Sequence, residues 1–115
     1  MRVHLIKELT VLNYARKHAG ALSPCKRFVH LINNADWEKP EDIKATFGNS
    51  NIDFLKGYPK VVIDIGGNNH RFICKYLFGK SSVHLFIHWL GTHAEYTELC
   101  DKEEQYTAEN FKSYT

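Results

Sequence analysis

The sequence predicts an α+β domain in which two to three helices pack on one face of a small antiparallel sheet, followed by a short C-terminal helix. Apolar and polar side chains alternate through residues 61–90, and the turn sequences GGNN (66–69) and GK (79–80) divide this stretch into two hairpins. Residues 8–19 and 23–35 instead carry apolar side chains at helical spacing. Two such helices can cover the apolar face of the sheet and complete a two-layer core.

The register of the second hairpin follows from its turn. Gly79-Lys80 fits a two-residue type II′ turn, which pairs Phe78 with Ser81 and Phe72 with Ile87. One face of the sheet is then apolar throughout, and residues 61, 63 and 65 of the first hairpin join it. The second face carries polar side chains between apolar ones: Asp64, Arg71, Lys75, His84 and His88, interleaved with Val62, Ile73, Phe86 and Leu90.

The remaining elements are read in chain order. Residues 2–6 are a short strand for the sheet edge, and the first helix buries a stripe that begins at Leu9 and includes residues 11, 12, 15 and 19. Ser23 as N-cap and Pro24 at the first helical position begin the second helix. A short helix occupies residues 40–48, and residues 49–59 form a loop that ends where Lys60 begins the first long strand.

Length and composition are those of one globular domain, with 115 residues of which 43% are hydrophobic and 24% charged. We expect this domain to occupy residues 1–100 and residues 101–115 to form an acidic tail, which continues as a helix, frays, or docks through Tyr106, Phe111 and Tyr114. No apolar run approaches the roughly 20 residues that span a bilayer, and the first residues lack the pattern of a secretory signal. Three widely spaced cysteines without a C-x-x-C pair indicate reduced thiols in a cytoplasmic protein, with Cys25 and Cys74 in the core.

The last predicted helix begins next to the polar face. Thr92 and Glu95 have the spacing of a capping box, so His93 lies in the first helical turn and Tyr96 on the same side as Thr92. A helix N-terminus favours anions, which suits a phosphate beside His93. The same residues could equally serve only to cap the helix.

The polar face has two interpretations. A basic face with imidazoles and aromatic rings suits single-stranded RNA, because cations contact phosphates and rings stack on bases. The residues before 101 carry a net charge of +4, from 13 Lys and Arg against 9 Asp and Glu, which weakly favours a polyanion. The alternative is an ordinary solvated outer face, which antiparallel sheets commonly have.

Other chemistries have no pattern in this chain. His84 and His88 would lie about 13 Å apart on a strand, and no zinc-ligand spacing, phosphate-binding loop or Ser or Cys nucleophile arrangement occurs. What remains is metal-free acid–base chemistry on an RNA phosphodiester, whose 2′-hydroxyl is the nucleophile. Arg71 would neutralise the phosphorane, helped by Lys75 or Lys60, while His93 exchanges protons and Tyr96 donates a hydrogen bond or stacks on a base.

These motifs resemble a known family. Gly67-Asn68-x-His70-Arg71 followed by a strand and Thr92-His93-Ala94-Glu95-Tyr96 is similar to HigB-type toxins of the RelE-like superfamily, and the likeness extends through residues 36–44 to most of residues 1–99. The resemblance implies a RelE-like fold and a cofactor-free mRNA endoribonuclease (mRNA interferase) that generally cuts ribosome-bound message. It also implies inhibition by a partner antitoxin of the helix-turn-helix type and no membrane partner.

The resemblance also implies roles for individual residues. Arg71, His93 and Tyr96 match the motif as catalytic residues, and the expected RNA-binding set is Lys60, Lys75, His84 and His88, with no metal ligand. The family often has Arg where this chain has His88 and Lys60, and usually Asp where it has Thr97, so the resemblance allows for a weakened or inactive toxin. The alternative functions are a non-catalytic RNA- or ribosome-binding module on the same fold and a scaffold for a protein partner.

Overall fold

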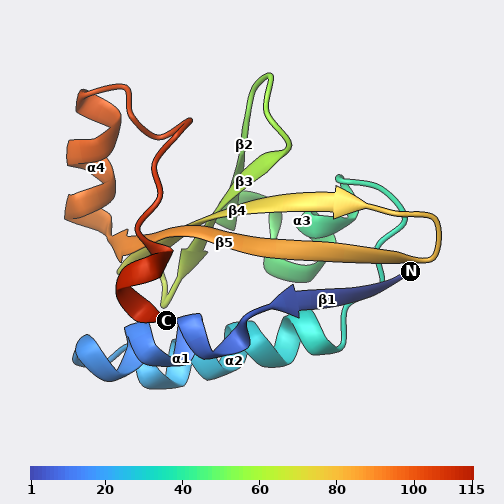
Figure 1. The fold of residues 1–115 in the computed structure, drawn as a ribbon, viewed down its shortest axis with the longest axis horizontal. Helices are drawn as coiled ribbons and strands as arrows, with labels where there is room; N and C mark the ends of the chain where they lie inside the picture. Colours follow the sequence, from blue (N-terminus) through green and yellow to red (C-terminus); the bar gives the residue numbers. More distant parts are fainter.

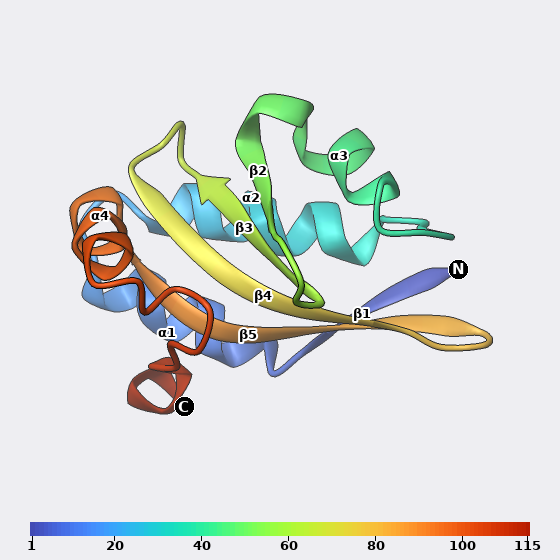
Figure 2. The ribbon, with the colours of Figure 1, turned by 90° about the horizontal axis from the view of Figure 1, so that it is seen from above.

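The computed structural model describes all residues from Met1 to Thr115. Five strands form one sheet in the order β1-β5-β4-β3-β2, in which β1 runs parallel to β5 and all other neighbours are antiparallel. Helices α1 and α2 cover one face, whereas α4 and the C-terminal tail lie on the other (Figures 1 and 2). The predicted α+β class is confirmed.

In chain order the elements are β1 (Arg2–Ile6), α1 (Glu8–Lys17), α2 (Leu22–Asn33), α3 (Asp42–Phe47), η1 (Asn49–Asn51), β2 (Ile52–Leu55), β3 (Lys60–Ile65), β4 (His70–Phe78), β5 (Ser82–Thr92), α4 (His93–Asp101) and η2 (Phe111–Tyr114). None of the helices is long and apolar enough to pass through a bilayer.

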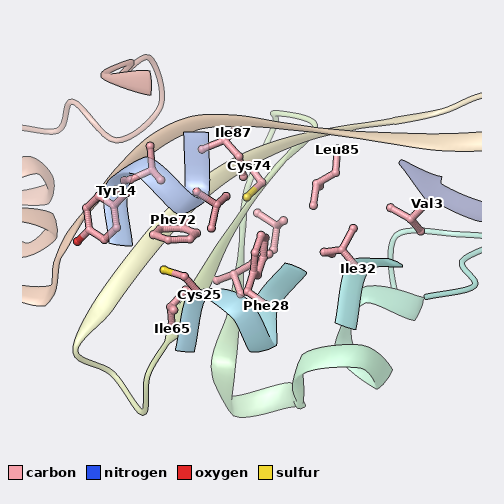
Figure 3. Packing of buried hydrophobic residues seen from close by; sticks show 14 of the residues in the cluster. Val3, Tyr14, Cys25, Phe28, Ile32, Ile65, Phe72, Cys74, Leu85 and Ile87 are labelled. Atoms are coloured by element: carbon pink, nitrogen blue, oxygen red, sulfur yellow. The ribbon is translucent and has the colours of Figure 1, made fainter. Parts of the chain in front are cut away.

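The main core lies between the sheet and helices α1 and α2. Figure 3 shows Phe28 and Ile32 of α2 facing Phe72, Cys74 and Leu85 of the sheet. As predicted, residues 61, 63 and 65 of β3 face this core, and Cys25 and Cys74 are fully buried in it as free thiols. Burial raises the pKa of the Cys25 thiol to about 12, so this thiol stays protonated and unreactive.

The two helices differ in detail from the prediction. Helix α1 buries Thr10, Val11, Tyr14 and Ala15. Leu9 is 55% exposed, and Ala19 is exposed beyond the end of the helix at Lys17, so the predicted stripe was wrong at its first and last residues. Tyr14 accounts for the rotation, because its buried hydroxyl needs a partner and finds it in His70 on β4. Helix α2 begins two residues earlier than predicted: Ala21 rather than Ser23 is the N-cap, and Ser23 and Pro24 lie within the first turn, where proline is tolerated.

The side chains of the first hairpin lie on the predicted faces of the sheet. Val61 pairs with Cys74 and Ile65 with His70 across a four-residue loop. Gly66 and Gly67 both have positive φ, at 67° and 62°, which explains why glycine is used twice in this loop. The loop ends directly before His70, the first residue of β4, and Arg71 is the second.

The register of the second hairpin was wrong by two residues. Phe78 pairs with Val83 rather than Ser81, because Gly79 does not adopt the positive φ that a type II′ turn requires. A two-residue shift preserves the facing of side chains, so Tyr76 and Cys74 still face the main core.

A β-bulge changes the facing further along. Cys74 pairs with Ile87 but Ile73 pairs with Trp89, so His88 is the extra residue on β5. Beyond it Phe72 pairs with Leu90 instead of Ile87. Leu90, predicted for the polar face, is therefore in the main core, and the prediction was wrong because one extra residue reverses the alternation.

Two segments form structure that could not be assigned from the sequence. Residues 49–59 were predicted as a loop, but Ile52–Leu55 form the edge strand β2, paired with β3. After α4 the chain turns back across the second face of the sheet and ends in η2 beside α1 (Figure 1). The tail therefore docks on the body of the protein.

Candidate active site

Arg71 lies on the second face of the sheet and is held from three sides. Its Nε is 3.2 Å from Oδ1 of Asp64, the residue paired with it on β3. Its Nη2 donates a hydrogen bond to Oδ1 of Asn68 at 2.6 Å, and its guanidinium carbon lies 5.1 Å from the centre of the Tyr96 ring. The guanidinium is thus a preorganised cation whose side chain is 23% exposed.

The start of α4 explains why Tyr96 lies beneath Arg71. The predicted capping box is present: the Glu95 amide donates to Thr92 Oγ1 at 3.2 Å, and the Thr92 amide donates to Glu95 Oε1 at 2.8 Å. Thr92 is also paired with His70 at the beginning of β4, so the helix starts beside the 66–69 loop. The fourth helical residue, Tyr96, then turns back onto the sheet.

Tyr96 belongs to a second, smaller core. It is buried with Leu55, Val62, Ile73 and Trp89, and its ring centre lies 6.0 Å from that of Trp89. Burial raises the pKa of the Tyr96 phenol, which therefore stays protonated. Since only 7% of Tyr96 is exposed and its ring already faces Arg71, it is better suited to supporting Arg71 than to stacking on a base.

His93 is exposed at the first position of α4, near the same end of the sheet. Its backbone amide donates to the Asn69 carbonyl at 3.0 Å, and its carbonyl accepts a hydrogen bond from Thr97 Oγ1 at 3.1 Å. Gly91, two residues earlier, is the cross-strand partner of Arg71. The backbone of His93 is fixed, whereas its imidazole makes no hydrogen bond and is accessible to solvent.

The two predicted RNA-binding lysines form a separate group. Lys60 and Lys75 are paired across β3 and β4, four residues from the Asp64–Arg71 pair, or about 13 Å along the strands. Lys75 is exposed. Lys60 donates a hydrogen bond from Nζ to the Tyr106 carbonyl of the tail at 2.6 Å.

The two predicted RNA-binding histidines lie apart from Arg71. His84 is paired with His4 of β1, and their ring centres are 5.7 Å apart. His88, at the bulge, lies under the tail, with its ring 6.3 Å from Phe111 and its carbonyl accepting from the Asn110 amide. Burial, followed by the charge of Lys60, lowers the pKa of His88, so it is neutral at pH 7.

Several residues near the site had no clear signal in the sequence. Asn68 was identified as a turn residue and as part of the family motif but was given no role at Arg71. Asp64 was identified only as a member of the polar face, although the first-hairpin register pairs it with Arg71. Tyr14 also escaped notice: its hydroxyl lies 2.8 Å from Nδ1 of His70, and its ring is stacked on His18 at 3.8 Å between centres. This cluster anchors the beginning of β4, one residue before Arg71.

Protonation of two buried imidazoles should make stability depend on pH. The pKa of His70 is lowered by burial and by His18, and that of His88 by burial and Lys60. The unfolded chain therefore binds more protons than the folded one below about pH 6.5, so stability is full above that pH and falls as the pH decreases toward the folded-state values. Denaturant unfolding at pH 7.5 and 5.5 should show this loss.

The matched variants isolate these two side chains. His70→Gln and His88→Gln should each reduce the loss of stability between the two pH values, whereas His30→Gln, on the exposed face of α2, should not. An unchanged loss in the double variant His70→Gln/His88→Gln would assign the effect to other groups.

A separate cavity lies on the helical side of the sheet. This cavity of about 350 Å³ is bordered by Ser23, Arg27 and Gly66 and shares only Asp64 with the contacts of Arg71. No three His, Cys, Asp or Glu side chains come close enough to hold a metal ion. Arg71 and the start of α4 therefore remain the candidate site.

A mostly antiparallel sheet with two helices on one face, and a fixed arginine beside the start of the last helix, defines a small α+β protein of the RelE-like type with a preorganised cationic site. The chain belongs to the HigB toxin family, described as the RelE-like toxic component of a toxin-antitoxin system, whose family model matches residues 21–99. It is also similar to the mRNA interferase HigB of Escherichia coli O6:H1, with 30% identity over 109 residues that cover 94% of this chain and 98% of the relative. The resemblance predicted from the sequence is confirmed.

Proposed function

We propose that this chain is the toxin of a toxin–antitoxin module and that it inhibits translation as an mRNA endoribonuclease (mRNA interferase) needing no metal or cofactor. Its substrate is ribosome-bound message in the cytoplasm, and its inhibitor is an antitoxin of the helix-turn-helix type. The observation that carries the proposal is the guanidinium of Arg71, fixed by Asp64, Asn68 and Tyr96 beside the start of α4. Family membership and the interferase relative support it.

The reaction needs little from the protein. The 2′-oxygen of the RNA forms a bond to phosphorus and loses its proton, while the bond to the 5′-oxygen breaks and that oxygen gains a proton. The products are a 2′,3′-cyclic phosphate and a 5′-hydroxyl, so no co-reactant is consumed. Arg71 stabilises the negative charge of the phosphorane, and His93 exchanges the protons.

Tyr96 acts on the reaction through Arg71. Because its phenol stays protonated, Tyr96 does not accept the proton of the 2′-hydroxyl; its ring holds the guanidinium in place. Lys60, Lys75, His84 and His88 are proposed RNA contacts outside this centre, and Lys75 is the most exposed of them. The tail bonds to Lys60 and covers His88, so these two residues are less accessible to RNA than Lys75.

Replacement of His93 tests the proton-transfer role. Positioned general acid–base groups contribute about 100- to 10,000-fold, so His93→Ala should slow cleavage of translated message at least about 100-fold. His30→Ala, an exposed imidazole on α2, is the matched control and should cut at the wild-type rate. Primer extension on message extracted after induction measures both. Wild-type cutting by His93→Ala would remove this residue from the mechanism.

Two observations at His88 favour a second function. The tail covers this residue, and its imidazole is neutral, whereas the family often has a charged Arg at the same position. The chain would then be a non-catalytic module that binds RNA or the ribosome. Primer extension separates the two: discrete cuts support the nuclease, whereas ribosome binding and growth arrest without cuts support the module. A helix-turn-helix protein encoded next to this chain and purifying with it would support the antitoxin.

A further inference from the structure

The tip of the β2–β3 hairpin presents an unusual aromatic pair. Tyr58 is the most exposed large aromatic residue, at 43%, and its ring is stacked on Tyr106 of the tail with centres 5.2 Å apart and an angle of 28°. Lys60 holds the pair together, because its Nζ donates to the Tyr106 carbonyl and lies 5.9 Å from the centre of the Tyr58 ring. We call these three residues, Tyr58, Tyr106 and Lys60, the tyrosine platform.

Positive charge surrounds the platform. Lys75 is the cross-strand partner of Lys60, and Lys56 lies in the turn two residues before Tyr58; both are exposed. None of these three lysines has a carboxylate within ion-pair distance. Unneutralised cations beside an exposed ring complement a ligand that combines a flat apolar surface with negative charge, which describes a nucleotide.

The platform also lies in line with the candidate active site. Lys60 and Lys75 occupy the same two strands as Asp64 and Arg71, four residues away, or about 13 Å. A single RNA strand with one phosphate at Arg71 can therefore place a nearby nucleotide at the hairpin tip.

We propose that the tyrosine platform is a subsite for single-stranded RNA, on which one base near the cleavage position stacks against Tyr58 while adjacent phosphates contact Lys56 and Lys75. This inference rests on the proposed nuclease function, which supplies the RNA. It assigns the platform to substrate binding and gives it no part in bond cleavage.

Binding of an uncleavable probe tests the subsite directly. A fluorescein-labelled 2′-O-methyl oligouridylate lacks the nucleophile, and its anisotropy reports affinity for the full chain. Tyr58→Ala should weaken binding roughly 5- to 100-fold, the range that base stacking on an aromatic side chain provides. Tyr58→Phe keeps the ring and should bind like the wild type. Leu77→Ala, which removes an exposed apolar side chain from β4, should also bind normally.

Two outcomes overturn the proposal. One is wild-type affinity in a natively folded Tyr58→Ala protein. If that variant loses its fold, the decision rests on Lys75→Ala, which alters an exposed side chain. This variant should reduce the slope of log Kd against log salt concentration by about one. Unchanged affinity and salt dependence in Lys75→Ala would then overturn it.

The result remains separable from the nuclease proposal. Weakened probe binding in Tyr58→Ala, combined with a wild type that never cuts message, would leave the subsite standing and reject the nuclease. Full binding by Tyr58→Ala, with normal cutting by the wild type, would do the reverse.

Discussion

Arg71→Ala should abolish growth arrest and reduce message cleavage by about 100- to 1,000-fold, the loss seen when one preorganised donor to a developing oxyanion is removed. Asp64, Asn68 and Tyr96 fix the guanidinium before substrate arrives, so little reorganisation is needed in the transition state. Arg71→Lys should recover only part of the activity, because an ammonium keeps the charge but loses the planar fork. Primer extension and growth after induction measure both variants.

The fold of the Arg71→Ala variant has to be checked beside its activity, by circular dichroism and thermal unfolding. The side chains of the Arg71–Asp64 pair are only 23% and 19% exposed, so loss of Arg71 leaves a largely buried carboxylate and costs more stability than loss of a surface ion pair. Arg27→Ala is the matched control, because Arg27 is exposed on α2 and forms no ion pair or hydrogen bond with Asp64, Asn68 or Tyr96. Full toxicity of a well-expressed Arg71→Ala protein would show that another group neutralises the phosphorane.

The local elements and the main core could be predicted because their signals are short in sequence. Helical spacing defined the two covering helices, alternation placed Val61 and Cys74 in the core, and Thr92 with Glu95 defined the start of α4. The side chains of the second hairpin next to its turn were predicted on the correct faces of the sheet despite the register error, because the error was an even number of residues. Arg71 and Tyr96, which the structure brings into contact, could be proposed as site residues because both belong to compact motifs.

The bulge and the tail could not be predicted, because both depend on contacts between distant segments. Strand β1 pairs with β5 only as far as Phe86, which leaves the edge beyond it open. The Asn110 side chain closes this edge by accepting from the Leu90 amide at 2.9 Å and donating to the Leu90 carbonyl at 2.7 Å. Nothing near Asn110 in sequence indicates this partner, and the bulge at His88 adjoins it. The bulge sets the facing of Leu90, and the docked tail covers His88.

Gly91→Ala should cost the most stability of any single methyl group added near the site. A Cβ at Gly91 would lie 2.2, 2.7 and 2.9 Å from three carbon atoms of the Trp89 indole, far inside normal contact. Trp89 cannot move freely, because it packs against Tyr96 in the second core. Overpacking of this kind costs about 1–3 kcal/mol or more, so we expect thermal unfolding to shift downward by at least about 5 °C.

The Gly91→Ala substitution should also lower the activity, because Trp89, Tyr96 and Arg71 are in contact with one another in series. Displacement of Trp89 moves Tyr96, and Tyr96 supports the guanidinium of Arg71, so message cleavage should fall together with stability. Gly20→Ala is the control: its φ of 79° also disfavours alanine, but no atom lies within 4 Å of the added Cβ, so it should lose about 1–2 kcal/mol and keep its toxicity. The double variant Trp89→Leu/Gly91→Ala identifies the cause. If the indole is responsible, Gly91→Ala costs less in the Trp89→Leu background than in the wild type, whereas an equal cost in both would assign the effect to the backbone of β5.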